Sequence, residues 1–306
     1  MSEKEEKNVA VRSNISEIKN KQRRAAAYKK LKMEKLKVKK EKKKAIEKLR
    51  NELGEEAVPK QIPKTIENQR VFDETKITES DDEIIAEAEN DSLGIHLSSR
   101  AQAKVLITTT DRPLSRTNKF CKELKKSIPF SEIYYRRGLD LKKITDQASK
   151  RGYTALIVVN EDRKTPNGMI ISHLPNGPTA SFRLSNVVFG REIKRSGELT
   201  DHLPELILNN FTTTVGNRIG RLFATLYPRD PDFHGRRVVT FHNQRDYIFF
   251  RQHRYQFRNE KRVGLQELGP RFTLKLRTLQ DGTFDSKFGD YEFIQQKEKC
   301  RRKFSL

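Results

Sequence analysis

Two stretches of the chain read almost alike: GPTASFRL at residues 177–184 and GPRFTLKL at residues 269–276. Both follow the pattern Gly-Pro-x-apolar-hydroxyl-apolar-basic-Leu. Alternation of apolar and polar side chains is typical of a β-strand with one buried face. The recurrence indicates a duplicated module within a chain of formal charge +22. A duplicated module in such a basic chain favours a two-lobed binding platform over a single catalytic cleft.

The alternation predicts which side chains of these strands share a face. The apolar positions form one face: Ala180, Phe182, Leu184, Phe272, Leu274 and Leu276. The basic and hydroxyl positions form the other: Ser181, Arg183, Ser185, Thr273, Lys275 and Arg277. That second face is either the solvated side of an amphipathic strand or a surface for phosphate and sugar, which basic and hydroxyl side chains contact in nucleic-acid complexes.

The overall composition points to a polyanionic partner. Lys and Arg outnumber Asp and Glu by 63 to 41, which favours nucleic acid ahead of a membrane surface. Apolar and charged residues each make up 34% of the chain, too polar for all of it to pack as one globule. No apolar run approaches the roughly 20 residues of a membrane helix, and the first residues lack the apolar core of a signal peptide. Cys121 and Cys300 lie far apart, which predicts a reducing, intracellular compartment without structural zinc.

The charge is unevenly distributed along the chain. We predict four parts: a basic helical extension over 1–53, a linker over 54–102, a folded domain over 103–293 and a basic tail over 294–306. Good helix formers run without Gly or Pro over 15–53, so a long helix is expected there, either solvated and partly disordered or ordered along phosphates. The linker contains an acidic run, 73–91, with 9 Asp or Glu and 1 Lys. This run is a spacer, a shield for the basic helix, or a site for a basic partner.

The order of predicted elements in the domain is that of an α/β sandwich made of two similar halves, 103–197 and 198–293. The first half reads β-α-β-α-β-β-β and ends in the first Gly-Pro strand. The second half opens with a stretch, 198–227, that is predicted to be helical. Two further strands follow it, at 238–241 and 247–253. They match strands of the first half and lead to the second Gly-Pro strand.

Basic residues recur where the predicted elements could offer them to RNA. The candidate contacts are Arg112, Arg116 and Lys119 at a strand end and helix start, Arg183, Arg271, Thr273, Lys275 and Arg277 on the Gly-Pro strands, Arg236, Arg237, Arg245, Arg251 and Arg254 in a basic hairpin, and Arg23, Arg24, Lys39, Lys40 and Lys43 on the N-terminal helix. Aromatic residues such as Tyr247, Phe249 and Tyr255 interleave with the hairpin cations. They either stack on bases or fill the strand core.

Signatures of enzymes are scarce. The sequence contains no phosphate loop of the GxxxxGK[ST] kind, no HExxH and no GxSxG. Its six His residues lack metal-ligand spacing. We therefore expect no catalytic residues, no metal, no cofactor and no small-molecule substrate.

Four motifs together resemble the Brix domain of ribosome-biogenesis factors over about residues 103–293. They are LITTTDRP at 106–113, PELILNNF at 204–211, VTFHNQRD at 239–246 and ELGPRFTL at 267–274. The resemblance implies two similar α/β halves of the kind found in anticodon-binding domains. It also implies a nucleolar protein that binds precursor ribosomal RNA and acts in assembly of the large (60S) subunit, with a dedicated protein partner in the same particle. Residues 269–283 match the family's sigma-factor-like motif, an RNA-binding element.

Two functions therefore stay open at the level of sequence. The first is a non-catalytic RNA-binding assembly factor that works in the nucleus and nucleolus. The second is a protein-interaction scaffold in the pre-ribosome, whose basic surface has little RNA specificity. Neither requires a membrane.

Overall fold

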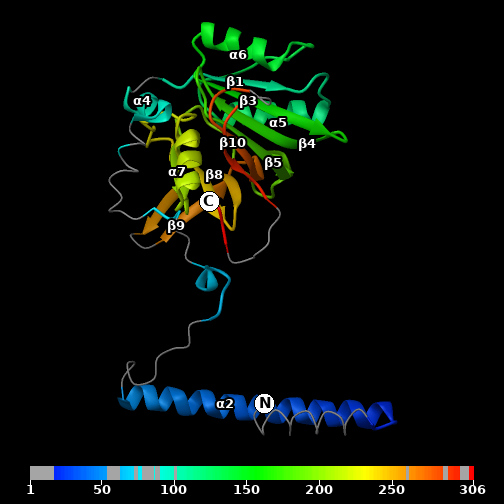
Figure 1. Ribbon diagram of the computed structural model, residues 1–306. Coiled ribbons are helices and arrows are strands. Elements are labelled where there is room, and N and C mark those ends of the chain that lie inside the picture. The colour runs from blue at the N-terminus through cyan, green and yellow to red at the C-terminus, as the bar shows by residue number, and fades with distance from the viewer. Residues whose placement is uncertain are drawn as a thin grey trace. The chain divides into compact units, whose positions relative to one another are not determined.

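The computed structural model of the protein describes residues 17–53, 63–71, 75–77, 86, 90–99, 102–259, 262–284, 289–296 and 303–306. They belong to two compact units, Met1–Asn68 and Gln69–Leu306, which Figure 1 draws. A single 3-10 turn, η1 (Glu67–Gln69), lies where the units meet in the sequence. Residues 1–16, most of the acidic run and residues 297–302 of the predicted tail lie outside the described residues, so expectations about them stay predictions.

The long helix of the first unit is α2 (Lys21–Leu53). Asn20 caps it, because its Oδ1 accepts hydrogen bonds from the backbone N–H groups of Gln22 and Arg23 at 3.0 and 3.1 Å. A cap of this kind satisfies amides that the first turn of a helix leaves without partners. Most large apolar side chains of α2, such as Tyr28 and Leu36, are exposed. The predicted long basic helix is confirmed, with its start at Lys21.

The second unit is built around one sheet of 11 strands. The strands are β1 (Val105–Thr109), β2 (Ser131–Ile133), β3 (Ala155–Asp162), β4 (Thr165–His173), β5 (Thr179–Val188), β6 (Glu205–Asn209), β7 (Arg237–Gln244), β8 (Tyr247–Asn259), β9 (Arg262–Glu267), β10 (Arg271–Gln280) and β11 (Tyr291–Ile294). Their order across the sheet is β2-β1-β3-β4-β5-β10-β8-β7-β6, with β9 beside β8 and β11 beside β10.

Helices cover the two faces of this sheet unequally. On one face, α5 (Ser115–Ser127) and α7 (Thr214–Ala224) pack Phe120 and Phe223 into the main core, where they meet the apolar side chains of the central strands. On the other face, α6 (Leu141–Lys150) packs through a small second core on β1 and β3, with Ile170 of β4 at its border. In the described part of the chain, no helix packs on that second face over β5, β10, β8 and β7.

The two Gly-Pro strands pair with each other at the centre of the sheet. β5 and β10 run antiparallel, with Leu184 opposite Leu274 and Phe182 opposite Leu276. Arg183 and Lys275 hold equivalent positions in the two copies, and they lie directly opposite one another. A pseudo-two-fold axis therefore passes between them, and the two halves are related as the subunits of a symmetric dimer would be. The predicted duplication, an α/β fold of two similar halves, is confirmed.

The sequence predicts that the stretch 198–227 is helical, and the structure shows that only part of it is. Residues Glu205–Asn209 form strand β6, which pairs in parallel with β7. The chain turns at Asn210, whose φ is 64°, and α7 begins only after Thr213. The side chain of Thr213 accepts a hydrogen bond from the N–H of Gly216 at 3.0 Å and so caps the helix. With this correction, the second half begins β-α-β and resembles the first more closely than predicted.

Residues before the first strand and after the last strand of the sheet also pack on the core of the second unit. α4 (Ser92–Ser98) buries Leu93 beside α7. Leu306 is also buried, and Asp246 Oδ1 accepts hydrogen bonds from the backbone N–H groups of Ser305 and Leu306 at 2.8 and 2.9 Å. These contacts tie residues beyond the repeated strands to the same core.

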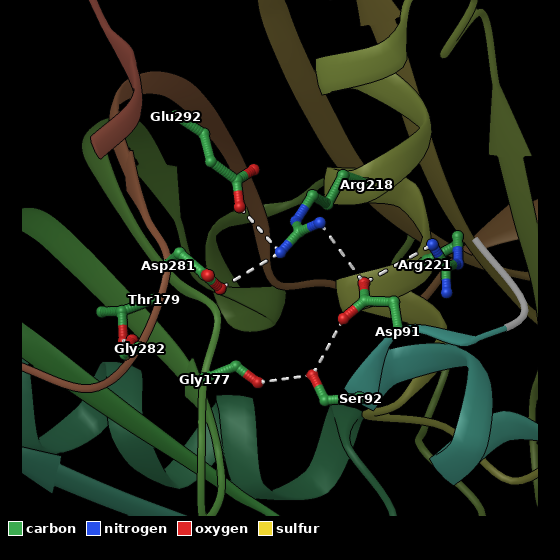
Figure 2. Close-up of polar contacts among 9 residues, drawn as sticks. All are labelled: Asp91, Ser92, Gly177, Thr179, Arg218, Arg221, Asp281, Gly282 and Glu292. Carbon is green, nitrogen blue, oxygen red and sulfur yellow. Dashed lines mark hydrogen bonds and ion pairs between the residues drawn. The ribbon is translucent and has the colours of Figure 1, made fainter. Parts of the chain in front are cut away.

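An arginine-centred cluster holds the start of α4 in place, as Figure 2 shows. Arg218 of α7 lies 3.5 Å from Asp91, 3.2 Å from Asp281 and 2.7 Å from Glu292. Arg221 adds a second contact to Asp91 at 3.6 Å. Because these residues come from α7, the segment before α4 and the end of the sheet, the cluster joins three separate parts of the chain.

Burial of His173 makes the stability of the second unit sensitive to acid. His173 ends β4, is 4% exposed and meets the ring of His96 on α4 at a centroid distance of 5.0 Å. Burial first, and then the charge of His96, lower the pKa of His173 from 6.5 to about 4. Between pH 6.5 and pH 4, His173 is therefore protonated in the unfolded chain but neutral in the folded chain. The stability that the neutral, buried ring contributes above pH 6.5 is lost as the pH falls towards 4.

We expect the free energy of unfolding to fall by about 2 kcal/mol from this group between pH 7.5 and pH 5. Urea unfolding of the full chain and of His173→Phe at both pH values isolates the effect, because the phenylalanine cannot titrate. The carboxyls of Glu123, Asp246 and Glu292, whose pKa values partial burial raises, contribute with the opposite sign in both proteins. Equal losses in the two proteins would contradict the assignment.

Candidate nucleic-acid interface

The helix-free side of the sheet over β5, β10, β8 and β7 is named the open face. Its members alternate with buried core residues such as Phe182, Leu274 and Phe250, as the sequence predicted for the two Gly-Pro strands. They are Arg183, Ser185, Thr273, Lys275, Tyr247, Phe249, Arg251, His253, Thr240 and His242. Cations, hydroxyls and aromatic rings therefore share one surface.

The centre of the open face is the Arg183–Lys275 pair on the pseudo-two-fold axis. Side chains directly opposite on antiparallel strands lie within about 5.5 Å at Cβ, so two positive charges are held side by side. The Lys275 ammonium also lies 4.8 Å from the ring centroid of Tyr247, a cation–π distance. Arg183 is exposed, and no carboxylate in the described residues forms an ion pair with it. The arrangement concentrates positive charge at one point.

Two further arginines of this region are anchored by neighbouring groups. Arg271 makes a fork to Glu267, with Nε to Oε1 at 2.8 Å and Nη2 to Oε2 at 2.5 Å, and this carboxylate raises the pKa of Arg271. Arg251 donates to the carbonyl of Phe250 at 2.7 Å, and burial lowers the pKa of its guanidinium. Glu267 therefore compensates the charge of Arg271, whereas Arg183 has no carboxylate partner among the described residues.

Arg237 does not belong to an RNA-binding surface. It is 3% exposed, and its guanidinium donates to the carbonyls of Thr200 at 2.8 Å, His202 at 3.2 Å, Lys126, and Ser127 at 3.5 Å. The last two carbonyls end α5, where the helix dipole favours a cation. Arg237 is thus a structural residue that binds a helix end, a loop and β7 together, and we remove it from the predicted RNA contacts.

Thr273 and Arg254 are also less accessible than the sequence suggested. Thr273 lies on the open face but is buried between β5 and β8, opposite Ser185 and Phe249. Arg254 is half-buried and donates to the carbonyl of Glu198 at 3.0 Å. Neither offers its full side chain to a ligand.

The group at the start of α5 is separated from the open face. Arg112, Arg116 and Lys119 are exposed, but α5 covers the opposite side of the sheet. The helix start, predicted as an anion site, already holds a carboxylate, because Glu161 Oε2 accepts a hydrogen bond from the N–H of Leu114 at 2.9 Å. These three cations therefore form a second basic surface.

The other predicted contacts are exposed at scattered positions. Arg236 and Arg245 lie at the ends of β7 in turns with φ of 46° and 56°. Arg277 is exposed at a bulge, where β10 shifts register against β5. The cations of α2 are exposed in the first unit: Arg23, Arg24, Lys39, Lys40 and Lys43. The predicted site is thus several surfaces, of which the open face is the most concentrated.

Several members of the open face are absent from the candidate contacts predicted from the sequence, among them Tyr247, Phe249 and His242. For Tyr247 and Phe249 the sequence leaves two interpretations open, base-stacking groups or strand core. Their parity along β8, opposite to that of the buried Ile248 and Phe250, places them outward and was available as a signal. His242 faces Phe249 across β7 and β8, a pairing that depends on register and has no local signal.

Other classes of site find little support. Among the described His, Cys, Asp and Glu residues, no three converge in a way that could hold a metal ion. Every helix within the described ranges is too short or too polar to cross a lipid bilayer.

Comparison with known proteins adds a family to this geometry. A family model described as "Brix domain" matches residues 111–278. The chain is 56% identical over 297 residues to Ribosome production factor 1 of Pongo abelii and of Mus musculus, covering 96% of this chain and 85% of each relative. It is 46% identical to Probable ribosome production factor 1 of Drosophila melanogaster, over 97% of this chain and 76% of that one. A solved structure, a probable ribosomal biogenesis protein from Aeropyrum pernix K1, aligns at 20% identity with a TM-score of 0.44, covering 57% of this chain and 96% of that chain.

Proposed function

The chain belongs to the Brix-domain family, and on that premise we propose that it is a non-catalytic ribosome-biogenesis factor that binds precursor ribosomal RNA of the large (60S) subunit. The names of its relatives support a role in ribosome production. Such a factor would work in the nucleus and nucleolus, inside pre-60S particles that contain other assembly factors and a dedicated protein partner. The open face is the proposed RNA contact.

One observation carries the proposal: the fold sets two cations, Arg183 and Lys275, directly opposite each other at the centre of a sheet face on which no helix of the described residues packs. Like charges in this position destabilise a sheet. A polyanion that binds over the pair offsets the repulsion between the two cations, because each phosphate attracts both of them. Lys275 already contacts the ring of Tyr247 and lies near the carboxyl of Asp246, so its charge is partly compensated. Arg183 is exposed and forms no ion pair with a carboxylate of the described residues, so a bound polyanion would stabilise the positive charge that remains there.

The neighbours of the pair suit RNA rather than an isolated phosphate. Tyr247 and Phe249 present aromatic rings beside the cations, and bases of unpaired RNA stack on such rings. The hydroxyls of Ser185 and Thr240 lie on the same surface and are typical contacts of phosphate and sugar. The exposed cations of α2 would add a non-specific attraction to neighbouring phosphates.

Changing Arg183 and Lys275 together to Gln is expected to weaken RNA binding about 30-fold at 0.1 M salt. Each lost phosphate contact also lowers the slope of log K against log salt by about 0.7–0.9, so the slope should fall by about 1.5. Filter binding of the full chain to labelled fragments of large-subunit precursor RNA measures both quantities. Urea unfolding checks that the variant is fully folded, because the change relieves the like-charge contact but also removes the contact of the Lys275 ammonium with the ring of Tyr247.

The matched control is Arg112→Gln with Lys119→Gln, which removes the same charge from exposed positions on the α5 side. Its effect on affinity should be clearly smaller. If both double variants weaken binding equally, net charge and not the open face governs RNA binding, and the proposed site is wrong.

A second candidate function, a protein scaffold within the particle, is favoured by the exposed apolar side chains of the β8–β9 hairpin. Pull-down after complete nuclease digestion separates the two functions. A partner retained in stoichiometric amount supports the scaffold, whereas release of every partner supports binding through RNA.

A further inference from the structure

The β8–β9 hairpin extends past the rest of the sheet. β10 pairs with β8 only as far as Phe250, and β7 only as far as Arg254, so the remaining residues of β8 pair with β9 alone. Within the described strands, β9 has no second neighbour. Figure 1 shows it at a border of the second unit. A two-stranded ribbon is marginally stable by itself, and its open edge is a template for another strand.

The pattern of hydrogen bonds shows which backbone groups of β9 face outward. The N–H of Tyr255 donates to Arg236 at 3.0 Å, away from β9, so its cross-strand partner Leu265 points its own N–H and C=O outward. The same alternation turns Val263 outward. One step further along, the carbonyl of Glu267 already accepts from the N–H of Gly197 at 3.0 Å. The open part of the edge therefore runs from Val263 to Leu265.

Apolar side chains gather on one face of this projecting ribbon. Phe257 pairs with Val263, and Tyr255 pairs with Leu265, so all four lie on the same side. Phe257 is 63% exposed, Leu265 64% and Val263 49%. Single exposed apolar residues are ordinary, but a contiguous group beside an open strand edge marks an interaction surface.

The chemistry of the patch selects a protein that carries acid. Val263 and Leu265 are aliphatic and have no ring on which a base could stack, which favours a protein over RNA. Arg258 and Arg262 are exposed on the opposite face of the same ribbon, because they alternate with Phe257 and Val263 along the two strands. Acidic side chains that alternate with apolar ones on an added strand would face these arginines. The carboxylate of the hairpin's described part, Glu267, is held by Arg271. We infer that β9 and the apolar face of the hairpin bind an acidic segment of a partner protein. That segment adds as a strand beside β9 and lays alternating apolar side chains on Phe257, Val263 and Leu265.

A designed probe tests strand addition directly: a ten-residue peptide in which Val or Ile alternates with Glu or Asp. Fluorescence anisotropy with the full chain should show binding that is at least 10-fold tighter than for the same peptide with Lys in place of the acids. Methylating alternate backbone nitrogens of the probe should also lower its affinity at least 10-fold. The methyl groups prevent backbone hydrogen bonds with β9 but leave the side chains of the probe unchanged. Equal binding of all three probes, or of none, overturns the inference.

Matched variants locate the site. Leu265→Pro removes an outward N–H at an edge position where strands tolerate proline. It should lower the affinity for the acidic probe at least 10-fold more than Leu265→Ala does. The pair Arg183→Gln with Lys275→Gln should leave the probe unaffected, so failure of RNA binding and failure of this site are distinguishable. Loss of the probe in the open-face variant with retention in Leu265→Pro would place the peptide on the open face and overturn the inference.

A photo-crosslinking amino acid at Phe257 of the full chain in cells identifies the natural occupant by mass spectrometry. We expect adducts to a protein segment of alternating apolar and acidic residues. Adducts to nucleotides would make the hairpin an RNA contact. Adducts to residues 73–91 of this chain or to its own β9 would make the occupant an internal segment or a second copy. Each of these three outcomes overturns the inference.

Discussion

Gly177→Ala and Gly269→Ala are each expected to lower the free energy of unfolding of the second unit by about 3–4 kcal/mol. Both glycines have positive φ, 92° and 71°. A Cβ at Gly177 would lie 2.5 Å from the carbonyl oxygen of Gly282, and one at Gly269 would lie 2.5 Å from the Cα of Gly190. In each case the obstacle is backbone, which cannot move aside as a flexible side chain could.

Two other glycines separate the conformational cost from the steric one. Gly138 and Gly152 also have positive φ, 80° and 73°, but nothing lies within 4 Å of an added Cβ. Alanine at either should cost only about 1 kcal/mol, the penalty for a left-handed backbone. Urea unfolding of the four variants makes the comparison. Equal losses at all four positions would mean that the close approach at the Gly-Pro turns does not constrain the fold.

These two turns explain why the duplicated sequence survives as a structural repeat. Each glycine lets another backbone segment come within contact distance at the entry to a central strand. In both copies the peptide bond to the following proline is cis. The strands that follow then pair with each other, so the turns set the junction between the halves. The repeated Gly-Pro motif thus marks the strands at which the two halves meet.

The sequence predicted the strand faces well because alternation is a local property. The positions of Phe182 and Arg183 on opposite faces of β5 could be read from period two alone. The direct pairing of Arg183 with Lys275 could not, because it depends on which strands meet at the centre and in what register. The most informative feature of the candidate site is therefore tertiary.

The short run Leu206–Leu208 shows where local pattern fails. Apolar residues spaced three or four apart around it fit a helix, and the same residues fit a buried strand of five. Pairing with β7 decides for the strand, and a single sequence gives no sign of that partner. The docking of α4 was missed for a related reason: its one buried leucine, Leu93, sits in a short segment with little periodicity.

Arg237 is a different kind of error, since the sequence held the correct signal. It has the same parity as Val239 and Phe241, both of which are buried in β7. Alternation therefore pointed its side chain into the core, whereas its neighbour Arg236 is exposed. Counting it among basic residues of a hairpin ignored the face on which it lies.

Replacing Arg237 by Met is consequently expected to cost about 3 kcal/mol of stability, because several buried carbonyls lose a charged hydrogen-bond donor. Methionine fills similar space but leaves the carbonyls of Thr200 and His202 without their donor, together with those that end α5. Arg237→Lys should lose less stability, because an ammonium keeps the charge and can still donate hydrogen bonds. It should lose some, because it cannot match the forked geometry of the guanidinium.

The neighbouring change Arg236→Met is the control, and it should alter stability by no more than about 0.5 kcal/mol. Urea unfolding gives the stabilities, and RNA binding is measured where each variant is fully folded. There, Arg237→Met should bind RNA as the parent does, because its guanidinium never reaches the surface. Weaker RNA binding with unchanged stability would return Arg237 to the interface, and would mean that the contacts between the end of α5, residues 200–202 and β7 open when RNA binds.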